Sequence, residues 1–197
     1  MRGYFGIGVE GISKAMNAGS LFRTGHAFGA SFLFTVGAVY SRFEGNNADT
    51  SDAPGQVPLY HFADPPSLML PQGCRLVGVE LLDEAIDLPS FRHPTNAAYV
   101  LGPERGSLSP ALVERCEFVV KIPTRFCVNL AVAAAIVMYD RVTSLGRFAS
   151  RPLRAGGPTE TLAPHTHGAP VFRKREAQRR AAVHHAPHRP RDPHEPE

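Results

Sequence analysis

The strongest constraint on the fold is the alternation of short, fully apolar segments with stretches of helical character. Segments 31–39, 97–101 and 118–122 are apolar at nearly every position. A strand of this kind buries both faces, which is typical of a parallel sheet covered by helices on both sides. The sequence therefore predicts an α/β domain with a mainly parallel sheet and helices on both faces.

The expected elements fill residues 1–150. We expect strands at about 4–9, 31–39, 75–81, 97–101 and 118–122, helices at about 13–28, 66–70, 110 onwards and 128–145, and a polar surface loop at 42–57. Ser109 before Pro110 is a typical helix start, because a serine oxygen can accept the first backbone N–H groups and proline fits the first helical position.

The composition changes at Arg151. The segment 151–197 holds eight of the 18 prolines, six of the nine histidines, and nine Lys and Arg residues against five acidic ones. We expect a disordered, basic tail there, which either adds salt-sensitive affinity for phosphates or is a plain extension. The body, residues 1–150, is nearly neutral, which argues against non-specific adhesion to nucleic acid over its whole surface and leaves room for a local basic patch.

Three cysteines without C-x-x-C spacing, Cys74, Cys116 and Cys127, favour a reducing cytoplasm and argue against a zinc site or a disulfide framework. We therefore expect no metal. The longest apolar run, Leu130–Tyr139, is too short for a bilayer that needs roughly 20 residues. No signal peptide is recognisable. The sequence predicts a cytoplasmic protein that does not span a membrane.

The stretch Gly6–Gly11 matches G-x-G-x-x-G, the motif of a dinucleotide-binding turn. That motif must follow a buried strand, and an acidic residue roughly 20 positions on must hold the ribose. Only five residues precede Gly6, and no Asp or Glu lies between Glu10 and Glu44. The context disfavours a nicotinamide enzyme, and we interpret the stretch as a strand and its exit.

Three polar clusters could carry chemistry. Asn17 and Arg23 lie about 120° apart around a helix, so both reach one pocket only if Asn17 lies in an irregular first turn; otherwise they are a cap and a surface side chain. Glu104 follows a strand, in a loop that either binds a ligand or is an ordinary turn. Asn129, at the start of an apolar helix, either caps it or points into a site.

Together the clusters resemble the SpoU branch of the SPOUT RNA methyltransferases. The shared pattern is N-x-G-x-x-x-R-T from Asn17, then L-G-x-E-x-G-x-L-S from Leu101, then I-P and an Asn-led helix ending in V-A-x-A-I-V-x-Y-[DE]. The resemblance covers about residues 3–146. It implies transfer of a methyl group from S-adenosylmethionine to a ribose 2′-hydroxyl of tRNA or rRNA, a trefoil knot, and a homodimer with the active site near the subunit interface.

The resemblance also implies roles for individual residues. Arg23 matches the proposed catalytic arginine, and Asn17, Glu104 and Asn129 match its partners near the active site. The positions that match the methyl-donor pocket are Val79, Leu101, Gly102, Ile122, Cys127 and Val128. Arginine is a poor base. The acceptor of the hydroxyl proton is therefore left open among Arg23 itself, a substrate phosphate and water.

Two departures from the family pattern concern the pocket rim. Cys127 stands where many relatives have serine, and the loop from Ile122 to Asn129 is shorter. The resemblance begins near Met1, so we expect RNA recognition from the dimer surface, the 42–57 loop or the tail. A non-catalytic RNA-binding or assembly factor on the same fold is the alternative, which the joint presence of the motif residues disfavours.

Overall fold

The structure is a computed structural model that describes residues 3–38, 53–149, 151–152 and 155–157. The chain divides into two compact units, Met1–Ala149 and Ser150–Glu197. All helices and strands described here belong to the first unit. The predicted tail therefore falls almost entirely outside the described residues.

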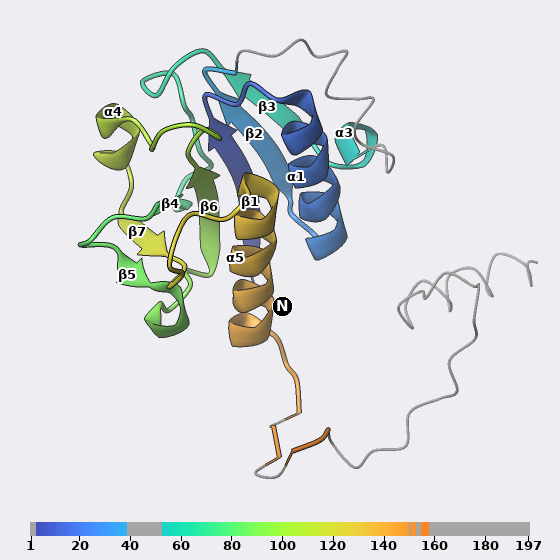
Figure 1. The fold of residues 1–197 in the computed structure, drawn as a ribbon. Coiled ribbons are helices and arrows are strands. Elements are labelled where there is room, and N and C mark those ends of the chain that lie inside the picture. Colours follow the sequence, from blue (N-terminus) through green and yellow to red (C-terminus); the bar gives the residue numbers. More distant parts are fainter. Residues whose placement is uncertain (1–2, 39–52, 150, 153–154, 158–197) are drawn as a thin grey trace, which may run out of the picture. The chain divides into compact units, whose positions relative to one another are not determined.

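In the described part of the first unit, one sheet holds seven parallel strands in the order β3-β2-β1-β6-β4-β7-β5 (Figure 1). The strands are β1 (Tyr4–Glu10), β2 (Phe32–Val36), β3 (Leu59–Phe62), β4 (Arg75–Val79), β5 (Ile86–Asp87), β6 (Asn96–Leu101) and β7 (Phe118–Lys121). The predicted α/β class and parallel sheet are confirmed. The central strands are buried on both faces, as their apolar sequences require.

Helices cover the two faces of this sheet (Figure 1). The helices are α1 (Ala15–Phe28), α3 (Ala53–Gln56), the 3₁₀ turn η1 (Leu88–Ser90), α4 (Pro110–Val113) and α5 (Leu130–Leu145). The long helices α1 and α5 pack against each other and share one core with β1, β6 and β4. Leu112 of α4 belongs to a second core with Phe34, Ala98 and Val100. Both faces are therefore covered by apolar side chains.

The order of the strands changes at the centre of the sheet. The chain runs from β1 outward through β2 and β3, whereas β6 lies on the other side of β1 and leads to β4, β7 and β5. In open parallel sheets, ligands bind at the carboxyl ends of the strands beside such a switch. The topology therefore directs attention to the loops after β1, β6, β4 and β7.

The glycines of β1 make room for aromatic rings. Gly6 and Gly8 lie inside the strand, and a Cβ atom on Gly8 would stand 2.5 Å from the ring of Phe34 in β2. The ring of Phe32 covers Gly6 in the same way. Of the three glycines of the motif, only Gly11, which follows β1 and has φ at +60°, needs a conformation that favours glycine. The match to a dinucleotide-binding turn is thus accidental, because its first two glycines are packing positions within a strand.

A buried arginine closes the opposite, amino-terminal edge of the sheet. Arg141 of α5 is fully buried and donates to the carbonyls of Tyr4 (3.1 Å), Pro94 (2.6 Å) and Thr95 (2.7 Å). Its guanidinium also lies over the ring of Phe5, 5.4 Å from the centroid. The carbonyls at the starts of β1 and β6 are thereby paired with a helix that comes later in the chain than either strand.

His93 belongs to the same buried cluster. Its Nδ1 lies 2.6 Å from the hydroxyl of Tyr99, and its Nε2 lies 2.8 Å from Asp140. Because Arg141 donates to the Tyr99 oxygen (3.1 Å), the Tyr99 proton faces Nδ1, and Nε2–H donates to Asp140. From the sequence, the position of His93 before Pro94 in a proline-containing loop predicts a solvated side chain. This prediction is wrong, because His93 is 4% exposed.

Several element predictions need correction. The helix expected at 66–70 is a turn, because the side chains of Asp64 and Ser67 bond the local backbone and close it. Two short strands, β3 and β5, went unpredicted. The end of the predicted loop at 42–57 is α3, and 42–52 lies outside the described residues. The predicted Ser109 cap is present, accepting from Leu112 N at 3.2 Å.

Candidate functional site

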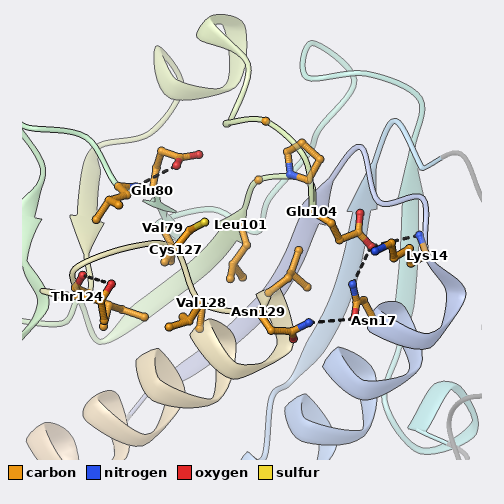
Figure 2. A pocket seen from close by; sticks show the side chains of 17 residues that line it. Lys14, Asn17, Val79, Glu80, Leu101, Glu104, Thr124, Cys127, Val128 and Asn129 are labelled. Carbon is orange, nitrogen blue, oxygen red and sulfur yellow. Dashed lines mark hydrogen bonds between the residues drawn. The ribbon is translucent and has the colours of Figure 1, made fainter.

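A cavity of about 320 Å³ opens at the carboxyl ends of β4, β6 and β7, next to the N-termini of α1 and α5 (Figure 2). It is lined by Lys14, Asn17, Val79, Glu80, Leu81, Leu101, Gly102, Pro103, Glu104, Gly106, Ile122, Thr124, Cys127, Val128, Asn129, Leu130 and Ala133. Its position beside the switch in strand order is where open α/β sheets bind ligands. Its size lies within the range of small-molecule sites.

Glu104 ties the loop after β6 to the start of α1. Its Oε1 accepts from the backbone N–H of Lys14 (3.2 Å) and from Asn17 Nδ2 (3.1 Å). Its Oε2 accepts from the backbone N–H and the hydroxyl of Ser13, both at 3.3 Å. The N–H groups at a helix start lack internal partners and attract anions, and the carboxylate, 90 residues from Lys14 in the chain, accepts from those of the two residues that directly precede α1.

These hydrogen bonds decide the ionisation of Glu104. Desolvation by burial by itself would raise the pKa of its carboxyl group. Hydrogen bonds from its own backbone, from Asn17, and from Ser13 and Lys14 outweigh that effect, and they hold the pKa of Glu104 below its ordinary value. Glu104 is therefore a hydrogen-bond acceptor at neutral pH, and it cannot donate a proton there.

Asn129 connects the third loop to the same network (Figure 2). Its Oδ1 accepts from Ala131 N at 2.9 Å and so caps α5, while its Nδ2 donates to Asn17 Oδ1 at 3.3 Å. Of the two possibilities that the sequence left open, the helix cap is observed; Asn129 also lines the cavity, and its role as a site residue stays a prediction. Asn129, Asn17 and Glu104 form one chain of side chains across the mouth of the cavity.

The rest of the cavity wall is largely apolar. Val79, Leu101, Ile122 and Val128 line it, in the positions that the resemblance gives to the methyl-donor pocket. Gly102 lies against the far end of its own loop, which runs from β6 to α4. A Cβ there would stand 2.9 Å from Leu108 N and 3.0 Å from Glu80 Oε2, so a side chain would displace this loop.

Two carboxylates that the sequence analysis missed hold the loop after β6. Glu80, at the end of β4, accepts from Leu108 N at 2.7 Å. Glu10, at the end of β1, accepts from the backbone N–H of Ser109 at 2.7 Å and from its hydroxyl at 2.6 Å. The sequence could have indicated both, because each is an acidic residue that directly follows an apolar segment. Both fix the loop that carries Gly102 and Glu104.

Arg23 is the one predicted site residue that does not line this cavity. It lies on α1, six residues after Asn17, and its side chain is exposed. The helix is regular from Ala15, so the angular separation between Asn17 and Arg23 persists. Cys127, by contrast, lines the cavity and is an exposed free thiol.

With this geometry in place, comparison with known families gives a direct result. The family model described as the SpoU rRNA Methylase family matches residues 5–139. This chain belongs to that family. The matched region contains the loops after β4, β6 and β7 that line the cavity, and it ends within α5. The match therefore covers both the sheet and the cavity.

Solved structures resemble the same region. The SpoU methyltransferase AviRb from Streptomyces viridochromogenes, in complex with the cofactor AdoMet, gives a TM-score of 0.65 at 22% identity over 75% of this chain and 60% of that chain. An rRNA methyltransferase from Sinorhizobium meliloti gives 0.64 at 20% identity over 73% and 57%. A structure described as giving insights into 2-OH methylation of C/U34 on tRNA gives 0.63 at 25% identity over 74% and 99%.

The SpoU family member described here thus spans only about three fifths of the length of the first two of these relatives. Comparison with curated proteins found no match. In the described part of the chain, no group of three or more His, Cys, Asp or Glu side chains could hold a metal ion. None of the helices described has the length and apolar character that crossing a bilayer requires.

Proposed function

We propose that this protein is an S-adenosylmethionine-dependent methyltransferase that methylates a ribose 2′-hydroxyl in tRNA or rRNA. The observation that carries the proposal is the chain of hydrogen bonds from Asn129 through Asn17 to Glu104. It joins residues of all three polar clusters, from the start of α1, the loop after β6 and the start of α5, at the mouth of one cavity. The joint presence of Asn17, Arg23, Glu104 and Asn129 argues against a fold retained without the activity.

The cavity suits the methyl donor. Apolar walls from Val79, Leu101, Ile122 and Val128 can enclose a flat purine, and Asn129 and Glu80 supply polar groups beside them. The absence of a side chain at Gly102 keeps the wall open where a Cβ would collide with Leu108 N. When bound, the donor supplies a methyl group on a positively charged sulfur, which an oxygen nucleophile can accept.

The protein's own task is then to bind and orient the ribose. The amide groups of Asn17 and Asn129 lie at the cavity mouth, where they can hold ribose or phosphate oxygens. A guanidinium group is a cation that can bond to oxygen anions, so we assign Arg23 to the 2′-oxygen and the neighbouring phosphate as an electrostatic partner. Glu104 positions the start of α1, because its oxygens are engaged by that helix.

We propose a homodimer because α1 and α5 leave an apolar hollow on the surface. This hollow is lined by Thr24, Phe28, Ala131, Val132, Ala135, Ile136 and Tyr139, and Tyr139 is 58% exposed. A second copy that covered it would meet the face of α1 next to Arg23. Arg23 of one copy would then serve the cavity of the other, which accounts for its place outside its own cavity.

The primary test is methyl transfer. The purified protein is incubated with total tRNA or rRNA and S-adenosylmethionine carrying a labelled methyl group, and the label is mapped to 2′-O-methylated nucleotides. Binding of the donor is measured separately by calorimetry. RNA binding without donor binding would overturn the proposal in favour of a non-catalytic RNA-binding or assembly factor.

The dimer is tested by mixing two inactive variants, Arg23→Ala and Asn129→Ala, after unfolding and refolding them together. If Arg23 acts across the interface, random pairing of the two variants restores about a quarter of the wild-type rate, because each mixed dimer has one intact site. If Arg23 acts within its own chain, the mixture stays inactive. Light scattering of the wild type gives the oligomeric state directly.

The family resemblance further supports a trefoil knot and a cytoplasmic location as parts of this proposal. The three cysteines are free thiols, which is compatible with a reducing compartment. The knot predicts slow refolding after complete denaturation, measurable as the recovery of donor binding with time.

A further inference from the structure

An exposed aromatic side chain lies on the loop that closes one side of the cavity. Phe126 is 74% exposed, although its neighbours Thr124 and Cys127 line the cavity. A single exposed apolar side chain is common on a soluble domain, so it is the position of this ring, on a loop that lines the cavity, that makes it a candidate for ligand contact. Phe126 is outside the set of residues to which the family resemblance gives a role.

Hydrogen bonds within the loop hold the backbone at Phe126. Thr124 N donates to Ile122 O at 2.7 Å, and the Thr124 hydroxyl donates to the carbonyl of Phe126 at 2.9 Å. Part of the cost of ordering this loop around a ligand has therefore been met by folding.

Cationic side chains on the loops of the cavity favour a polyanion. Arg125 precedes Phe126 and is exposed, Arg105 is exposed on the loop after β6, and Lys14 lines the cavity. The carboxylates that line the cavity, Glu104 and Glu80, are engaged by backbone N–H groups. An aromatic face beside cationic side chains is the combination with which proteins bind unpaired bases and their phosphates.

We propose that Phe126 is a stacking platform for an unpaired nucleobase of the RNA substrate, with Arg125 contacting the adjoining phosphate. The substrate class that follows is RNA with accessible, unstacked bases, such as a loop, because a base inside a duplex cannot expose its face to the ring. This inference rests on the proposed function and names the kind of RNA that the site takes.

A second copy of the chain is the competing occupant of Phe126, and the structure favours RNA. The apolar hollow suited to a second copy is formed by α1 and α5 and does not include Phe126. The two residues that precede Phe126 in the chain, Thr124 and Arg125, are polar and charged. A single ring among polar groups fits a stacked base better than the core of a protein interface, which excludes charged residues.

The absence of tryptophan from the whole chain allows a direct test. In the variant Phe126→Trp, the new side chain is the sole tryptophan and its fluorescence reports stacking. The probe is an unstructured RNA of about 12 nucleotides, compared with the same sequence in a blunt duplex. Single-stranded RNA should quench the emission by about half or more, and the duplex should change it little, since stacking needs a free base face.

Phe148→Trp is the matched control. Phe148 is 66% exposed and follows the C-terminus of α5, whereas the cavity lies at the N-terminus of that helix. The emission of this control should not respond to the single-stranded probe. Equal quenching in both variants, or equal quenching of Phe126→Trp by single strand and duplex, would overturn the proposal. So would an unchanged emission of Phe126→Trp when filter binding shows that the RNA is bound.

Kinetics separate this inference from the proposed function. Phe126→Ala should raise the KM for RNA about tenfold and change kcat less than about twofold, whereas Phe126→Tyr should keep both, because one stacked base is lost only in the alanine variant. Normal kinetics of Phe126→Ala beside an active wild type would refute the platform alone. A wild type without methyl transfer or RNA binding would refute both.

If the emission of Phe126→Trp is blue-shifted without RNA and shifts red on dilution, the ring belongs to an interface with a second copy.

Discussion

Asn129 at the start of α5 donates its side-chain amide to Asn17 in α1, 112 positions earlier in the chain. The same Asn129 side chain caps α5 through its oxygen. Its position therefore depends on the helix that it caps, and that helix packs against α1. The contact between the two asparagines couples the packing of the two longest described helices to the geometry of the cavity mouth.

A substitution of Asn129 can separate its role as the cap of α5 from its contact with Asn17. Asn129→Ser should keep the helix cap, because serine is nearly as good as asparagine there, so we expect the free energy of unfolding to change by less than about 0.5 kcal/mol. The donor to Asn17 is lost, and kcat/KM for methyl transfer should fall about tenfold or more as the site loses its alignment. Urea unfolding and initial rates measure the two effects. Wild-type activity in this variant would show that the Asn17 contact is dispensable.

Glu104 should make stability depend on pH in the acid range. Its pKa is lowered in the folded protein relative to the ordinary value of 4.5, so the folded state binds fewer protons than the unfolded state between those two values. Its stabilising contribution is therefore present above pH 4.5 and is lost as the pH falls through the folded pKa. In Glu104→Gln this contribution should be absent, and the stability difference between the two proteins should narrow below pH 4.5. A constant difference from about pH 7 to about pH 3 would contradict this.

His93 should add a second pH dependence, nearer neutrality. Desolvation by burial is the main cause that lowers its pKa below 6.5, and the charge of Arg141 acts in the same direction, against the opposing effect of Asp140. The unfolded chain therefore takes up a proton first, and stability should fall as the pH drops below 6.5 towards the folded pKa. Thermal unfolding of wild type and His93→Gln between about pH 8 and about pH 5 measures this. The variant should be less stable at the alkaline end of this range, and the difference should shrink towards the acid end.

Gly8 tests the packing explanation of the glycine motif. Gly8→Ala should destabilise the protein by about 1–3 kcal/mol, because the new methyl group collides with the ring of Phe34. Adding Phe34→Leu should recover part of the loss, so that the double-mutant cycle shows a coupling of about 1 kcal/mol. The readout is the free energy of unfolding, and additive effects would show that the glycine serves something other than the ring.

The apolar strands and the Ser109 cap were predictable from the sequence because each depends on residues that are neighbours in the chain. The expected helix at 66–70 failed because Asp64 and Ser67 bond the local backbone and compete with helical bonds. His93 was misjudged since its partner Asp140 lies 47 positions away. Nothing local distinguishes a buried histidine from a solvated one in a proline-containing loop.

The sequence by itself determined the parallel α/β architecture and the three motif loops, because strand patterns and loop residues are local properties. Only the tertiary structure decided that Glu104 satisfies the start of α1, and that Arg23 is outside the cavity formed by its own chain. It also showed that Gly6 and Gly8 make room for Phe32 and Phe34. These features depend on pairs of groups far apart in the chain, and their distances are set by the order of strands in the sheet.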